Sequence, residues 1–138
     1  MEIKKVVVIG SGTMGSGIAA HLCNAGVPVT LLDLTTEISE KARERIHKSK
    51  PPLLIDKGKI KNINVGNIEE NFDVVKDADW VVEAVVERID IKHHIYEKIF
   101  KNRKKGTIVS SNTSSIPIKV LSEKLTDEEK KDFCITHF

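Results

Sequence analysis

The chain has 138 residues, and its 22 Lys and Arg against 20 Asp and Glu leave a formal net charge of +2. This weak charge, with an aromatic content of 4%, argues against a nucleic-acid-binding surface, which needs basic patches or stacking side chains. The length fits one domain, and no apolar run approaches the ~20 residues that a membrane-spanning helix requires. We expect a cytoplasmic protein, because the first strand leaves no room for a targeting peptide and only two cysteines, Cys23 and Cys134, are present.

The first strand is predicted over residues 4–9, an apolar run that leads into a glycine-rich turn. A helix over 13–24 follows and ends near Gly26, which suits the left-handed position beyond a helix end. A second strand over 28–33 completes a strand–turn–helix–strand unit, the arrangement that binds a dinucleotide.

Each residue type in this unit meets a physical demand of such binding. Gly10 permits the tight turn, Gly12 lets backbone N–H groups approach a pyrophosphate, and Gly15 lets the helix pack closely on the sheet. Asp33 stands about twenty residues on, where a carboxylate can accept hydrogen bonds from both hydroxyls of a ribose. Because Asp33 repels a 2′-phosphate and no Arg follows it, NAD is favoured over NADP.

Strands and helices alternate through the rest of the chain. Thr36 is expected to cap a helix over 37–48, and residues 53–62 suggest only a short basic turn or ragged helix. The remaining predicted elements are a strand at 64–66, a helical turn at 72–77, a strand at 80–83, a helix at 89–101, a strand at 107–111, a helix near 117–124 with Pro117 in its first turn, and a strand at 133–138. The fold class is therefore α/β, a doubly wound, mainly parallel sheet of the Rossmann type.

Three later features narrow the class of protein. They are the run Val-Val-Glu-Ala-Val-Val-Glu at 81–87, Lys92, and the run Ser-Asn-Thr-Ser-Ser at 111–115. Together with the glycine turn and the closing His137-Phe138, they resemble the L-3-hydroxyacyl-CoA dehydrogenases. The resemblance is clear over residues 3–38 and 78–118 and poor over 50–70.

The resemblance implies an NAD-binding domain over residues 1–138, followed by a helical domain that completes the substrate site and forms a homodimer. It assigns cofactor contacts to Gly10, Gly12, Thr13, Met14, Gly15, Asp33, Val86, Glu87, Lys92 and Ser114. The bland alternatives are that Met14 only fills the core, that Asp33 only ends a strand, and that Glu87 and Lys92 form a surface pair worth well under ~1 kcal/mol.

By the same resemblance, His137 is the catalytic base and Ser114 the second catalytic residue, which holds the 3-oxygen of the substrate. An imidazole suits removal of a hydroxyl proton near neutral pH. Asn112 would orient Ser114, and Ser49 matches a position that contacts coenzyme A, although Pro51-Pro52 departs from the usual helical hairpin there. The glutamate that pairs with this histidine in the family would lie further along the chain.

The implied reaction is NAD-dependent oxidation of L-3-hydroxyacyl-CoA to 3-oxoacyl-CoA, in fatty acid β-oxidation or 3-hydroxybutyryl-CoA metabolism. Two alternatives stay open: a related hydroxy-acid dehydrogenase of the gulonate type, and an NAD-binding module without catalysis. No metal site is expected, since the adjacent His93 and His94 do not share a helix face.

Overall fold

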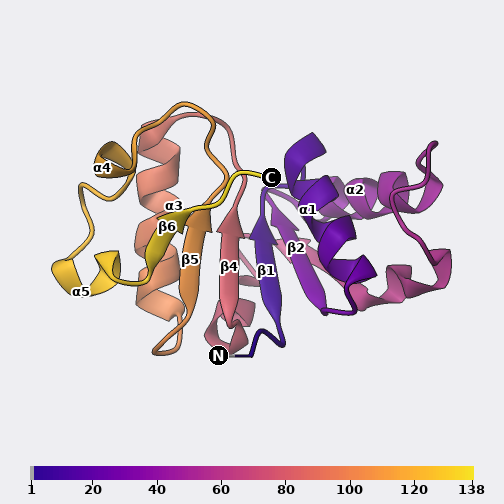
Figure 1. The fold of residues 1–138 in the computed structure, drawn as a ribbon, viewed down its shortest axis with the longest axis horizontal. Helices are drawn as coiled ribbons and strands as arrows, with labels where there is room; N and C mark the ends of the chain where they lie inside the picture. The colour runs from indigo at the N-terminus through magenta and orange to yellow at the C-terminus, as the bar shows by residue number, and fades with distance from the viewer. Residues whose placement is uncertain (1) are drawn as a thin grey trace.

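Six parallel strands form one sheet in the order β3-β2-β1-β4-β5-β6 in the computed structural model, which describes residues 2–138. The chain order reverses between β1 and β4, so the connections leave these two neighbouring strands in opposite directions. Figure 1 shows β1 and β4 side by side with their carboxyl ends at the same edge of the sheet. In open α/β sheets, ligands bind outside the carboxyl ends of the strands at such a switch point. The strands are β1 (Val6–Ile9), β2 (Val29–Asp33), β3 (Ile63–Asn67), β4 (Trp80–Glu83), β5 (Ile108–Ser111) and β6 (Phe133–Ile135).

Helices cover both faces of this sheet, as the sequence predicts. The α-helices are α1 (Thr13–Asn24), α2 (Thr36–Lys48), α3 (Ile89–Asn102), α4 (Ile118–Leu121) and α5 (Asp127–Lys130), and the 3-10 helices are η1 (Lys57–Asn62) and η2 (Phe72–Asp77). One apolar cluster joins α1 and α2 to the sheet through residues such as Ile18 and Ile46. A second cluster joins α3 and η2 through Ile99 and Val75. The doubly wound α/β class is therefore confirmed.

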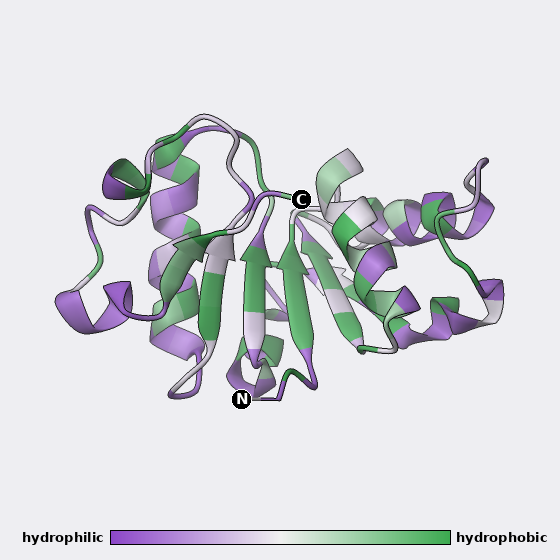
Figure 2. Ribbon diagram, in the orientation of Figure 1, coloured by the Kyte–Doolittle hydropathy of each residue, from purple (hydrophilic) through white to green (hydrophobic). Residues whose placement is uncertain are grey.

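The central strand β1 serves both clusters. Its side chains alternate, so that Val6 and Val8 pack under α1 while Val7 and Ile9 pack under α3. All four are at most 3% exposed, and Figure 2 shows β1 in the hydrophobic colour along its whole length. A strand buried on both faces is typical of a parallel sheet.

Most predicted elements are confirmed, with differences at their ends. The cap of α2 is Thr35, whose hydroxyl accepts from the N–H of Ile38 at 3.2 Å, and the predicted Thr36 is the first helical residue. Pro117 precedes α4, which is only four residues long, and the last strand has three residues. The separate helix α5 was not predicted, although its capping box of Thr126 and Glu129 is readable in the sequence.

Two further findings concern the predictions from composition. Within residues 2–138, no helix is both long and apolar enough to cross a bilayer. Both cysteines are free thiols, and burial raises the pKa of each.

Candidate dinucleotide-binding site

The glycine turn lies at the switch point, between the ends of β1 and β4. Gly10 has a φ of +104°, and a Cβ on it would come within 2.5 Å of the carbonyl oxygen of Ala84. A Cβ on Gly15 would overlap the carbonyl oxygen of Gly10. Both positions therefore require glycine for the turn and for the close approach of α1 to the sheet.

Gly12 differs from these two glycines. A Cβ built on it would meet no protein atom within 4 Å, and its φ of −69° is open to any residue. The protein itself gives no reason for glycine here. The space in front of Gly12 is a cradle that a side chain would fill, as expected if a ligand approaches the backbone.

The first turn of α1 faces this cradle with its backbone N–H groups uncompensated. Gly12 is the N-cap, no side chain caps the helix, and the first turn contains no acidic residue. The exposed N–H groups and the positive end of the helix dipole favour an anion such as a phosphate. Thr13, which begins the helix, is exposed at the same end.

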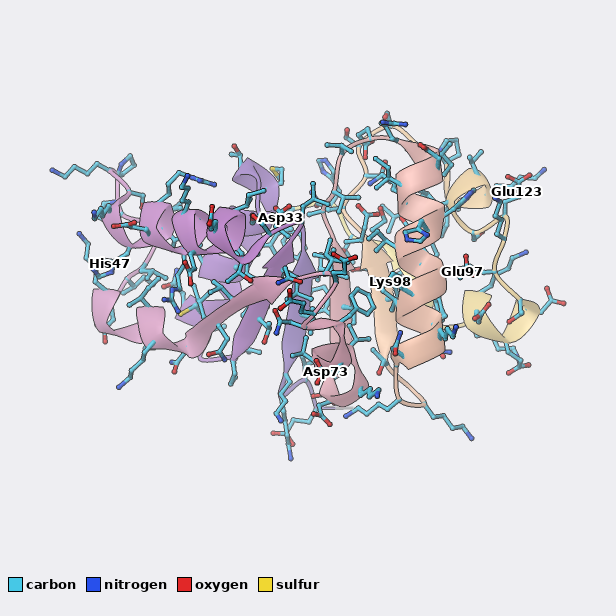
Figure 3. All side chains as sticks on the ribbon, turned by 180° about the vertical axis from the view of Figure 1, so that it is seen from behind. Asp33, His47, Asp73, Glu97, Lys98 and Glu123 are labelled. Atoms are coloured by element: carbon cyan, nitrogen blue, oxygen red, sulfur yellow. The ribbon has the colours of Figure 1, made fainter. Side chains whose placement is uncertain are left out.

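Asp33 stands at the end of β2 beside the glycine turn, and Figure 3 shows it close to the inner end of α2. Its Oδ2 atom accepts from the backbone N–H of Ser11 at 2.8 Å and from the Ser11 hydroxyl at 2.5 Å. Its Oδ1 atom accepts from the N–H of Leu34 at 2.7 Å. A carboxylate has about four acceptor positions, so one stays available on Oδ1.

A cavity of about 410 Å³ joins the glycine turn to Asp33. Its lining residues are Gly10, Ser11, Gly12, Asp33, Leu34, Ile38, Arg45, Ile68, Ala84, Val85, Val86, Ile91 and Ile95. The lining combines the polar residues Ser11, Asp33 and Arg45 with apolar side chains such as Ile38 and Ile68, which suits a ribose and a flat base. The sequence indicated no Arg near Asp33. In the folded chain, however, α2 brings Arg45 to the same cavity. Its Nη2 atom donates to the Ser11 carbonyl at 3.1 Å.

Lys92 lies at the centre of a buried polar network. Its ammonium group is 0% exposed and donates to Glu83 Oε2 at 2.6 Å, and it lies 3.1 Å from Glu87 Oε1. The other oxygen of Glu83 accepts from the hydroxyls of Tyr96 at 2.5 Å and Ser111 at 2.7 Å. Burial and the Glu83 carboxylate raise the pKa of Tyr96 far above its ordinary value. The ammonium group is thus enclosed by protein, whereas the sequence predicted a cofactor contact.

Glu87 connects the loop after β4 to the loop after β5. Its Oε2 atom accepts from the hydroxyls of Thr113 at 2.7 Å and Ser115 at 3.0 Å. Partial burial raises its pKa, but the hydrogen bonds from Thr113, Lys92 and Ser115 outweigh that effect and bring the pKa to about 2. Glu87 is therefore charged at neutral pH and holds both neighbours of Ser114.

The predicted catalytic residues lie at the carboxyl ends of β5 and β6. Ser114 and His137 are both exposed. The side-chain oxygen of Asn112 accepts from the backbone N–H of Phe138 at 3.2 Å, so the structure connects Asn112 to the histidine segment, where the sequence expectation was a contact with Ser114.

Of three further predicted residues, two lie away from the Asp33 cavity and one lines it. Met14 is 43% exposed and lines a separate groove with Phe138 at the start of α1. Ser49 closes the end of α2, since its hydroxyl donates to the Ile46 carbonyl at 3.1 Å and accepts from the Leu53 N–H at 2.9 Å. Val86 is 61% exposed and lines the Asp33 cavity. The assigned roles of these residues stay predictions.

The glycine cradle, the open helix start and the Asp33 cavity together fit a dinucleotide, and the fold is that of the cofactor domain of a dehydrogenase. Comparison with known proteins gives the particular family. Residues 5–138 match the model described as 3-hydroxyacyl-CoA dehydrogenase, NAD binding domain, and the chain belongs to this family. Its cofactor is NAD.

Individual relatives agree with this assignment. A Deinococcus radiodurans protein named "Probable 3-hydroxyacyl-CoA dehydrogenase" is 41% identical over 100% of this chain and 42% of its own length. The crystal structure of 3-hydroxybutyryl-CoA dehydrogenase from Escherichia coli superposes with a TM-score of 0.85 at 27% identity, over 100% of this chain and 30% of that one. (S)-3-hydroxybutyryl-CoA dehydrogenase PaaH1 from Ralstonia eutropha gives a TM-score of 0.82 at 29% identity, over 99% and 50%. The chain spans at most about half the length of such relatives.

Proposed function

We propose that this chain is the cofactor domain of an NAD-dependent L-3-hydroxyacyl-CoA dehydrogenase, which oxidises L-3-hydroxyacyl-CoA to 3-oxoacyl-CoA. The observation that carries the proposal is the attachment of the His137 segment to the end of β5. On one side of His137, the Thr136 N–H donates to the Ser111 carbonyl at 3.0 Å. On the other side, the Phe138 N–H is held by Asn112. These bonds hold the backbone on both sides of His137 at the edge of the sheet that carries Ser114, and the His137 side chain is exposed there.

The reaction divides between the cofactor and the protein. NAD, when bound, supplies the hydride acceptor. His137 accepts the proton of the 3-hydroxyl group, and the Ser114 hydroxyl donates a hydrogen bond to the same oxygen. The hydrogen bonds from both neighbours of Ser114 to Glu87 hold the loop that carries Ser114 in place. The loop keeps this position while the 3-oxygen of the substrate changes from alcohol to carbonyl.

The test is turnover of acetoacetyl-CoA and NADH by the full-length protein. His137→Ala is expected to lower kcat by about 100-fold to 10,000-fold, the range of general acid–base catalysis. His94→Ala, at an exposed position on α3, is the matched control and should leave kcat unchanged. Full activity in His137→Ala would remove the catalytic assignment. Turnover of gulonate alone would favour the hydroxy-acid alternative, and NAD binding without any turnover would favour a non-catalytic module.

We also propose that the full protein has a helical domain after residue 138, forms a homodimer and works in the cytoplasm. The short span of this chain within its relatives supports the further domain, and the two free thiols suit a reducing compartment. Light scattering of the full-length protein measures the dimer, and cell fractionation measures the location. A relative in Arabidopsis thaliana is named as peroxisomal, so fractionation must resolve that organelle.

A further inference from the structure

We propose that Arg45 is positioned to bind a phosphate at the adenosine end of the cavity, and that Asp33 alone prevents it from binding the 2′-phosphate of NADP. This inference rests on the proposed binding of NAD and adds the residues that choose between the two dinucleotides. Asp33 and Arg45 are the charged residues among those that line the cavity. Both are attached to the same residue of the glycine turn, Ser11.

The attachment joins the two charges to the two peptide groups that flank one residue, Ser11. Asp33 receives the N–H and the hydroxyl of Ser11, whereas Arg45 donates to its carbonyl. Ser11 is only 2% exposed, and its carbonyl also accepts from the Ser16 hydroxyl at 2.9 Å. Ser11 is therefore held in place, and its carbonyl in turn holds one N–H group of the Arg45 guanidinium near Asp33.

Arg45 retains most of its binding capacity. A guanidinium has five N–H donors, and the hydrogen bond to Ser11 uses one of them. Among residues 2–138, no carboxylate lies within 4.0 Å of its nitrogens, although salt bridges of that length occur at other cations, including Lys48 on the same helix. An exposed, unpaired guanidinium that lines a ligand cavity is suited to a phosphate, which it can bind through two parallel hydrogen bonds.

Asp33 opposes that use of Arg45. Dinucleotide sites read the ribose through a carboxylate on the 2′-hydroxyl, or through an arginine on a 2′-phosphate. This cavity contains both. Since the carboxylate excludes a phosphate by charge, NAD binds and the arginine is left without a 2′-phosphate. Removal of the carboxylate is therefore expected to create an NADP site without any new cation.

The experiment is titration calorimetry of the 138-residue chain with NAD+ and with NADP+, using Asp33→Ser, Arg45→Gln and the double variant. Asp33→Ser should weaken the binding of NAD+ and tighten the binding of NADP+ by about 10-fold to 100-fold each. A change of this size corresponds to one or two hydrogen bonds to a charged group. The double variant should lose that gain for NADP+. Arg45→Gln alone should change NAD+ affinity by less than about threefold. Circular dichroism verifies that each variant is folded.

The matched control is Lys41→Gln, which removes an exposed positive charge from the same helix at a position outside the cavity. Combined with Asp33→Ser, it should preserve the gain for NADP+. The inference is overturned if the gain survives Arg45→Gln, if Lys41→Gln abolishes it equally, or if Arg45→Gln weakens NAD+ as much as NADP+, which would place Arg45 on the pyrophosphate. Failure of the proposed function has a different signature: either the unaltered chain would bind no NAD+ at all, or the full-length protein would bind NAD+ without turning over acetoacetyl-CoA.

Discussion

Replacement of Lys92 by methionine tests whether the buried network stabilises the domain as the geometry indicates. Lys92→Met removes the cation that lies 2.6 Å from the carboxylate of Glu83, and both side chains are 0% exposed. Glu83 would then be a buried charge with only neutral partners. Breaking one half of a buried pair costs about 3–5 kcal/mol. For a domain of this size, each kcal/mol lowers Tm by roughly 3–4 °C, so we expect a loss of about 9–20 °C.

The assay is thermal and urea unfolding followed by circular dichroism, with two comparison variants. The double variant Glu83→Gln with Lys92→Met contains no buried charge. Its new carboxamide can accept from the Val85 N–H and donate to the hydroxyls of Tyr96 and Ser111, because hydroxyl groups rotate. It should recover most of the lost stability. Lys101→Met, exposed on the same helix, should cost under about 0.5 kcal/mol. A single variant as stable as the parent, or a double variant as unstable as Lys92→Met, would refute the reasoning.

Four other substitutions have defined outcomes. Gly12→Ala should change the free energy of unfolding by less than about 1 kcal/mol and weaken NAD+ binding at least tenfold, measured by calorimetry. Gly15→Ala should unfold the domain, because its Cβ would overlap the Gly10 carbonyl oxygen. An unchanged NAD+ affinity in Gly12→Ala would contradict the role of the cradle. Glu87→Gln should cost about 1–2 kcal/mol near pH 6, a value reduced because the side chain is 38% exposed. Since the folded pKa of Glu87 is about 2 against an ordinary 4.5, this difference should shrink as pH falls from 4.5 towards 2 in urea titrations, and a constant difference would be inconsistent with it. Asn112→Ala should speed hydrogen exchange of the amide that follows His137, and unchanged protection would show that the side chain does not anchor it.

The succession of strands and helices along the chain and the glycine turn could be predicted from the sequence because local patterns determine them. The apolar run before Gly10, the spacing to Asp33 and the three- and four-residue repeat in α3 all act within one element or between neighbours. The helix α5 was not predicted although its capping signal is local. It has only four residues, all of them polar, so it shows no apolar periodicity.

The roles of Lys92 and Arg45 could not be predicted in this way. Each depends on a partner that only the folded chain supplies: Glu83 at the end of β4 for Lys92, and the Ser11 carbonyl, 34 residues earlier, for Arg45. In the sequence, a lysine that follows two glutamates within ten residues is indistinguishable from a member of a surface ion pair. Only tertiary packing distinguishes a solvated cation from an enclosed one.

The alternation along β1 has a consequence for how the domain tolerates damage. Truncation of Val8 to alanine would open a void only in the layer beneath α1, and truncation of Val7 only in the layer beneath α3, because the backbone of the sheet stands between the two. Losses on opposite sides of this partition should therefore add independently, even though the two side chains are consecutive in the chain.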